Sequence, residues 1–185
     1  MEATITKQFS LEEPVEKVWA GLSDPMRIST CVPGASITEQ IDDTNYKGEV
    51  TLKFGPVKAK YDGQITIQEM DDSSHKMTLI GKGLDSKGKG SAEMTMNGVA
   101  VANGDKTDVD FNMIVNIQGT IAQFGSRLIN DVSAQLMNQF VDNFKALLAG
   151  EEFDNSLKAG SMVGSVLKNK VSGIFKKKEE NTEEA

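Results

Sequence analysis

Between residues 46 and 117 the sequence alternates between apolar and polar side chains, and this alternation constrains the fold more than any other feature. A period of two is typical of strands that bury one face and leave the other in water. The alternating segments are 46–54, 57–67, 77–81, 92–96 and 109–117, and Asp-Asp, Gly-Pro and Gly-Asp pairs lie between them. The pattern predicts an antiparallel meander with one wet face.

A helical pattern follows the meander. Apolar residues recur every three to four positions across Gly119–Ala149, at Ile121, Phe124, Leu128, Val132, Leu136, Phe140, Phe144 and Leu147. We expect one amphipathic helix of about 28 residues, roughly 40 Å long. A curved sheet and a long helix would bury their apolar faces against each other, which predicts an α+β fold.

Two short helices are expected before the meander. Met1–Leu11 alternates like a strand, and Glu12-Glu13-Pro14 then opens a helix, because proline and acidic residues suit a first turn. Pro25 starts a second short helix, which ends at Cys31–Gly34.

The C-terminal part of the chain has a different charge from the rest. Residues 156–178 hold six lysines and no acid, although the whole chain carries a net charge of −7. Apolar residues at helical spacing form one face of this segment. We predict a basic amphipathic segment that binds a membrane surface. The binding residues would be Val163, Leu167, Lys168, Lys170, Val171, Ile174, Phe175, Lys176, Lys177 and Lys178.

The alternative for this segment is a solvated, mobile terminus. Its apolar residues are interrupted, so no run of membrane-spanning length is expected. The predicted organisation is a ligand-binding domain over 1–149, a linker over 150–155, the membrane-binding segment over 156–178 and an acidic end over 179–185.

Residues with catalytic chemistry are sparse. The chain has one cysteine, Cys31, which allows no internal disulfide and fits a cytosolic protein. The one histidine, His75, lies in a predicted turn, where solvation is a commoner role than catalysis. One histidine and one cysteine make no metal site. An acidic body with few aromatic residues argues against nucleic-acid binding. We therefore expect no metal, no nucleic acid and no enzymatic activity.

Methionines gather on the predicted inner face of the sheet, and Gly48, Gly63 and Gly81 on that face would leave space beside them. The face is either ordinary core or the flexible lining of a cavity for an apolar ligand, and the sequence favours the cavity. Phe124 would cap one mouth. The predicted lining residues are Cys31, Phe54, Tyr61, Met77, Met94, Met96, Phe111, Met113, Phe124 and Leu128.

Several short motifs carry a family resemblance. They are Leu22–Pro25 (LSDP), Cys31–Gly34 (CVPG), Gly48–Val50 (GEV), Phe54–Val57 (FGPV) and Gly119–Leu128 (GTIAQFGSRL). With this order of elements, residues 2–149 resemble the START-like (SRPBCC) helix-grip superfamily. Within that superfamily the chain is similar to the CoxG family of carbon monoxide dehydrogenase subunits.

The resemblance implies a START-like helix-grip fold and a non-enzymatic role without a resident cofactor. It also implies an apolar cavity for a quinone such as menaquinone, and a molybdenum hydroxylase of the carbon monoxide dehydrogenase type as partner. The expected location is cytoplasmic, peripheral to the inner face of the cell membrane. Two alternatives stay open: a START-like cyclase, for which Tyr61 supplies the one inward polar group, and an assembly factor with a collapsed core.

Overall fold

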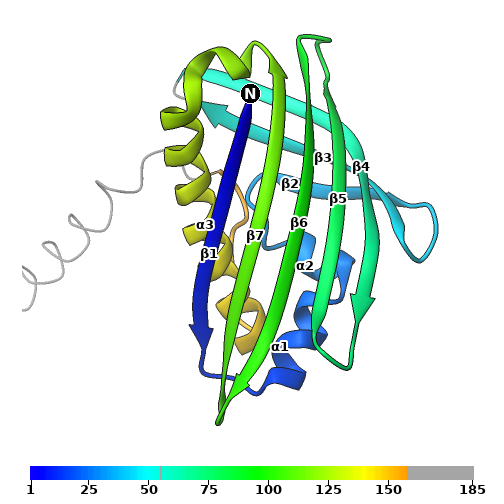
Figure 1. Cartoon of the computed structure of the whole chain (residues 1–185), viewed down its shortest axis with the longest axis vertical. Helices are drawn as coiled ribbons and strands as arrows, with labels where there is room; N and C mark the ends of the chain where they lie inside the picture. Colours follow the sequence, from blue (N-terminus) through cyan, green and yellow to red (C-terminus); the bar gives the residue numbers. More distant parts are fainter. Residues whose placement is uncertain (55, 158–185) are drawn as a thin grey trace, which may run out of the picture.

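In the computed structural model, one curved antiparallel sheet wraps around a long helix (Figure 1). The structure describes residues 1–54 and 56–157, and Phe54 by its backbone alone. The strands are β1 (Glu2–Leu11), β2 (Ala35–Gln40), β3 (Asn45–Phe54), β4 (Val57–Asp71), β5 (Lys76–Asp85), β6 (Gly90–Asn103) and β7 (Lys106–Gly119). They are ordered β1-β7-β6-β5-β4-β3-β2 in the sheet.

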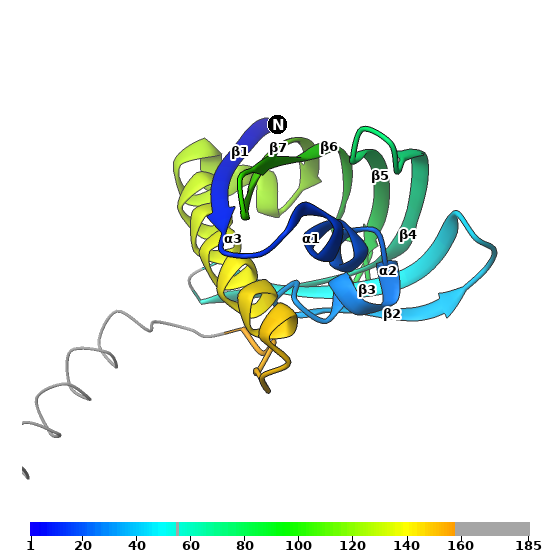
Figure 2. The same cartoon turned by 90° about the horizontal axis from the view of Figure 1, so that it is seen from below.

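The helices close the open side of this sheet. They are α1 (Val15–Leu22), α2 (Pro25–Ser29), a 3₁₀ turn η1 (Ile121–Phe124) and α3 (Gly125–Ala149). Seen from below, the sheet forms a U, with α3 across its opening and α1 and α2 at the near end (Figure 2). The predicted α+β helix-grip architecture is confirmed. The apolar side chains of the alternating pattern lie on the inner face of the sheet, and the amphipathic helix α3 covers that face.

One predicted boundary was wrong, and one strand was missed. The long helix begins at Gly125 instead of Gly119, because β7 continues to Gly119 and the chain then makes the 3₁₀ turn. Gly119 and Gly125 have φ of 88° and 77°, values that interrupt a right-handed helix. Strand β2 was not predicted at all. It is an edge strand with mostly exposed side chains, so it lacks the apolar alternation that marks the other strands.

The glycines on the inner face let neighbouring strands approach closely and do not leave space for a ligand. Gly48, Gly63 and Gly83 lie directly opposite one another on β3, β4 and β5. A Cβ atom at Gly63 would lie 2.2 Å from the carbonyl oxygen of Lys82. The expected room beside Gly48 and Gly63 is therefore occupied by neighbouring backbone, which approaches closely because no side chain intervenes.

The apolar interior is divided into two clusters. The lower cluster joins α1, the C-terminal half of α3 and the ends of β5–β7 through Leu11, Val15, Val18, Trp19, Cys31, Met77, Ala100, Val109, Phe144 and Leu148. The upper cluster joins β4, β7, η1 and the start of α3 through Ala3, Ala59, Tyr61, Ile117, Ile121 and Ile129. Phe144 is fully buried and anchors α3 against α1.

Candidate ligand-binding interior

The methionines predicted to face inward lie together at the centre of the sheet. Met96 of β6 is directly opposite Met113 of β7, and Met94 lies on the same face one row away, opposite Val115. Residues directly opposite in an antiparallel pair project from the same face, with Cβ atoms about 5 Å apart. The structure thus brings Met94, Met96 and Met113 into one patch.

Part of this patch lies between the two clusters. Among the described residues, Met94 and Met113 are assigned to neither cluster, and both are half-buried although α3 covers this face. Leu136 and Met137 of α3 are likewise half-buried between the helix positions that pack into each cluster. Solvent therefore still reaches apolar side chains at the middle of the molecule, which a fully packed core would not allow.

Met94 occupies the room beside one inward glycine. A Cβ atom at Gly81 would lie 2.8 Å from Cε and 2.9 Å from Cγ of Met94. The expected space at Gly81 is thus filled by a thioether side chain, which has three rotatable bonds and repacks readily. The lining beside Gly81 can therefore change its shape, although it leaves no empty space there.

Sequence reasoning missed Met70, which also belongs to this face. The register of β4 against β5 shifts between Ile67 and Glu69, and the shift places Met70 directly opposite Met77. A bulge of this kind moves every later residue to the other face, so the odd positions that face inward over residues 57–67 do not lead on to Met70. The signal available in the sequence was the change of phase after Ile67.

The remaining predicted lining residues lie at the two ends of the interior. Met77, Met96 and Cys31 belong to or pack against the lower cluster, whereas Tyr61 and Leu128 belong to or pack against the upper one. Phe111 is buried on β7, opposite Lys7. Phe124 of η1 is 36% exposed. The predicted set therefore spans the whole length of the inner face instead of one small site.

Cys31 is a structural thiol at the base of the interior. It is fully buried, and desolvation raises the pKa of its thiol. Its carbonyl oxygen accepts a hydrogen bond of 3.0 Å from the side-chain amide of Asn143, which is itself buried on α3. This bond fixes the turn after α2 against the long helix.

Replacing Asn143 with leucine is expected to destabilise the protein by about 1–3 kcal/mol, because the buried carbonyl of Cys31 loses its partner. Urea denaturation would measure the change in the free energy of unfolding. Asn138→Leu is the matched control on the same helix. Asn138 is exposed and accepts its hydrogen bond from Lys7 at the surface, so the change should stay within about 0.5 kcal/mol. Equal losses in both variants would contradict the role given to Asn143.

The β4–β5 turn is attached to α1 by its side chains. The indole N–H of Trp19 donates to Asp72 Oδ1 at 2.7 Å, and the ring centroids of Trp19 and His75 lie 5.5 Å apart. His75 is half-buried and has φ of 51°. Its ring packs on Trp19, in addition to facing solvent as predicted. This contact holds the lower end of the U together.

The phenol of Tyr61 is a polar group on a face that is otherwise mostly apolar. Tyr61 is buried, and desolvation raises its pKa, with a further contribution from the nearby negative charge of Asp85. Tyr61 therefore keeps its proton and can act as a hydrogen-bond donor. Asp85 lies directly opposite it, but its carboxylate accepts hydrogen bonds from the backbone N–H groups of Lys87 and Lys89 in the following turn.

The described residues contain no group of three or more His, Cys, Asp or Glu side chains that could hold a metal ion. Within the same residues, no helix is long and apolar enough to cross a membrane. The predicted membrane-binding residues Val163–Lys178 lie outside the described part of the chain.

The residues predicted as a linker contact the domain. Phe153 packs against the lower cluster, and the Gly34 N–H donates to the carbonyl oxygen of Asn155 at 2.9 Å. The side-chain amide of Asn155 donates to the carbonyl oxygen of Ala35 at 3.4 Å. The chain therefore runs from the end of α3 back to the turn before β2, where the described residues end at Leu157.

Comparisons with known proteins agree with this fold. A conserved protein from Geobacillus kaustophilus superposes with a TM-score of 0.72 and 24% identity, covering 80% of this chain and 96% of that one. A START superfamily protein from Mycobacterium smegmatis gives a TM-score of 0.56 at 8% identity, covering 80% of this chain and 97% of that one. The Zhui aromatase/cyclase from Streptomyces sp. R1128 gives 0.60 at 8% identity, covering 80% and 94%.

At the sequence level, residues 8–149 match the CoxG family of carbon monoxide dehydrogenase subunits. A search of curated proteins gives no match.

Proposed function

We infer that this chain, which belongs to the CoxG family of carbon monoxide dehydrogenase subunits, is an accessory protein that binds an apolar molecule between its sheet and its long helix. Family and fold together support a ligand-binding or cyclase-type protein. The proposed ligand is a quinone such as menaquinone, and the proposed partner is a molybdenum-containing oxidoreductase of the carbon monoxide dehydrogenase type. The basic segment 156–178 would hold the protein at the inner face of the cell membrane.

One observation carries the ligand-binding proposal. The interior is split into two packed clusters, and Met94 and Met113 between them stay half-buried under α3. A ligand that filled this middle region would join the two clusters into one continuous core. Methionine side chains suit such a ligand because they are flexible and polarizable.

A quinone fits the few polar groups on this face. Quinone rings are flat and apolar and carry carbonyl oxygens that accept hydrogen bonds. The phenol of Tyr61 is protonated and buried, so it can donate one such bond. Tyr61 lies at the upper cluster, and the isoprenoid chain of the quinone would then extend along the methionine patch.

A cyclase-type enzyme is the second candidate function, and Tyr61 with Asp85 is the nearest approach to an acid–base pair on the described inner face. Two features argue against it. Asp85 is engaged with turn amides. Its charge also raises the pKa of Tyr61, which makes that phenol a poorer source of phenolate at neutral pH. A non-enzymatic carrier therefore accounts better for this arrangement.

Met113→Trp is expected to weaken binding of a short-chain quinone analogue at least tenfold while the protein stays folded. The larger ring would occupy the middle region, at a cost in stability of about 1–3 kcal/mol. Ile114→Trp is the matched control, because Ile114 is the next residue on β7, points to the opposite face and is 41% exposed. Isothermal titration would measure the affinity and circular dichroism the fold.

Equal affinities in the two variants would contradict the proposed site. A wild-type protein that bound no analogue would favour the assembly factor with a collapsed core. Mass spectrometry of organic extracts from protein purified from its native host would then identify the ligand directly.

A further inference from the structure

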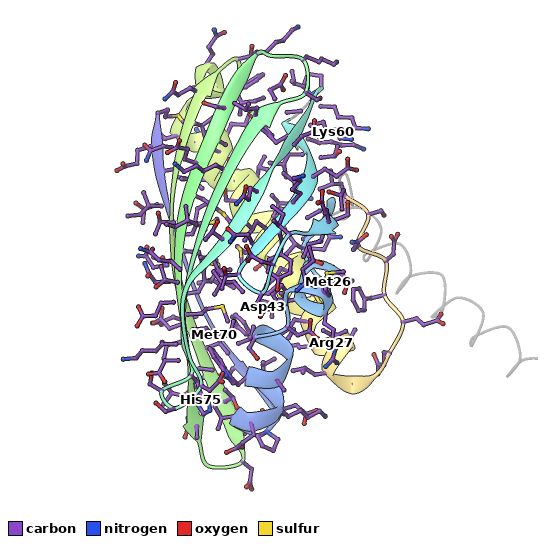
Figure 3. All side chains as sticks on the ribbon, turned by 90° about the vertical axis from the view of Figure 1, so that its right-hand side faces the viewer. Met26, Arg27, Asp43, Lys60, Met70 and His75 are labelled. Carbon is purple, nitrogen blue, oxygen red and sulfur yellow. The ribbon has the colours of Figure 1, made fainter. Side chains whose placement is uncertain are left out.

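Three apolar side chains on α2, after β2 and at the end of β4 are exposed. Met26 of α2 is 50% exposed, Ile41 after β2 is 45% exposed, and Met70 at the end of β4 is 36% exposed. Figure 3 shows Met26 and Met70 on the same side of the molecule, with Asp43 between them in that view. Met70 also lies opposite Met77, so this surface adjoins the methionine-rich inner face. Clustered exposed apolar side chains commonly mark an interaction site.

Carboxylates lie within two residues of each of these side chains in sequence, and we call the whole surface the acid-rimmed face. Asp24 is the N-cap of α2, Asp42 and Asp43 form the β2–β3 turn, and Asp72 lies in the β4–β5 turn. The first three come together in space: burial raises the pKa of Tyr46, and the negative charges of Asp43, Asp24 and Asp42 raise it further. The cations nearest to these four acids in sequence are Arg27, Lys47 and Lys76, and Lys47 already pairs with Glu39.

The basic segment of this chain begins beside the acid-rimmed face. Asn155 and Leu157 both contact Gly34: its N–H donates to the Asn155 carbonyl, and a Cβ atom at Gly34 would lie 3.1 Å from Cγ of Leu157. Gly34 lies in the turn that joins α2 to β2, and these two elements contact each other. The chain beyond Leu157 thus leaves the domain next to the turn between α2, which carries Met26, and the start of β2.

We propose that residues 158–178 dock on the acid-rimmed face of the same molecule when no membrane is present, and that an anionic membrane surface competes for them. The apolar residues Val163–Phe175 would cover Met26, Ile41 and Met70, and the lysines would face the surrounding carboxylates. Release of the docked segment by lipid rests on the membrane binding proposed above, whereas the docking itself does not.

Chain length permits this contact. Residues 158–162 span at most about 17 Å when extended. Residues 163–175 span about 20 Å as a helix. The target is close, because α2, which carries Met26, has five residues and ends just before the same turn.

Charge selects this occupant over a lipid surface. An anionic leaflet would repel Asp24, Asp42, Asp43 and Asp72, so the face is unsuited to direct membrane contact. A segment with six lysines and no acid is complementary to it. Because individual surface ion pairs are weak and screened by salt, the docking should be reversible and salt-sensitive.

The test uses the full chain with a nitroxide spin label at residue 169, introduced as Asn169→Cys. Cys31 is fully buried with a raised pKa, so its thiol should react poorly with the label. NMR should show amide signals of residues 24–32, 41–45 and 70–75 broadened in low salt, by at least half of their intensity. Signals of outward positions such as Thr95 and Asn112 should keep their intensity. Adding phosphatidylglycerol vesicles should restore the broadened signals.

Charge reversal supplies the controls. Asp43→Lys should at least halve the broadening, whereas Asp110→Lys, at an exposed outward position of β7, should leave it unchanged. Mixing spin-labelled protein with unlabelled, isotope-enriched protein should produce no broadening, because the contact is within one molecule.

Three results would overturn the proposal: no selective broadening of the face, broadening insensitive to Asp43→Lys, or broadening that appears only between molecules. The last result would assign the face to a second copy of the chain. Selective broadening that vesicles do not relieve, in a protein that fails to sediment with them, would leave docking intact and contradict the proposed membrane binding.

Discussion

Truncation after Leu157 is expected to remove nearly all sedimentation of the protein with anionic vesicles. The deleted part holds all six lysines of the basic segment and its apolar residues. Each lysine near an anionic leaflet contributes on the order of 1 kcal/mol, so even half of this sum corresponds to a more than hundredfold loss in partitioning. Vesicle co-sedimentation with phosphatidylglycerol measures it.

The position of the truncation matters for this experiment. Residues 150–157 contact Gly34, Ala35 and the lower cluster, so ending the chain at Gly150 would also disturb the domain. Full-length protein should bind neutral vesicles weakly, and salt should reduce its binding to anionic ones because the basic contribution is screened. Equal sedimentation of the full-length and truncated proteins would show that the basic segment is not the anchor.

Gly63→Ala should strongly destabilise the sheet. The new Cβ would lie 2.2 Å from the carbonyl oxygen of Lys82 and 2.8 Å from Cα of Gly83, both parts of the backbone of β5. Backbone cannot rotate away as a side chain does, so β4 and β5 must separate and the curl of the sheet must relax. We expect a loss of about 3 kcal/mol. That loss corresponds to a decrease in Tm of about 6–12 °C.

Gly98→Ala is the matched control for this substitution. Gly98 also lies within a strand of the sheet, but its Cβ would meet only Cγ of Met77 at an ordinary 3.7 Å. Its Tm should stay the same or rise slightly, because alanine loses less backbone entropy on folding than glycine does. Differential scanning calorimetry compares the two variants. If Gly63→Ala melted at the wild-type temperature, the close approach of β4 to β5 would not be a requirement of the fold.

Periodicity predicted the faces of β3–β7 because their inner side chains are apolar and their outer ones polar along nearly their whole length. It failed where the regular repeat is interrupted. The register shift after Ile67 reverses the phase of β4, so the predicted inner face stopped at Ile67 and did not include Met70. Strand β2 carries too few buried side chains to show alternation. The pattern 121–124 looked helical because a 3₁₀ turn spaces its apolar residues almost as an α-helix does.

The candidate site was predicted as a set of residue types on one face, and the structure adds their arrangement. That Met96 lies opposite Met113 follows from strand register, which depends on the turns and bulges between the strands. The hydrogen bond from Asn143 to Cys31 joins residues far apart in sequence, and no local sequence pattern predicts it. The buried asparagine in an apolar helix face was the available hint, since a buried amide requires a partner.

The sheet is never closed by its own backbone, and this has a consequence for the size of what it encloses. Its edge strands β1 and β2 do not pair, and α3 lies across the gap between them (Figure 2). The helix is held there by packing and by the buried hydrogen bond from the Asn143 side chain to the Cys31 carbonyl oxygen. In a closed barrel, the continuous ladder of inter-strand hydrogen bonds fixes the circumference. Here a small outward shift of α3 would enlarge the interior without breaking an inter-strand hydrogen bond, so the sheet itself sets no fixed limit on the size of the enclosed space.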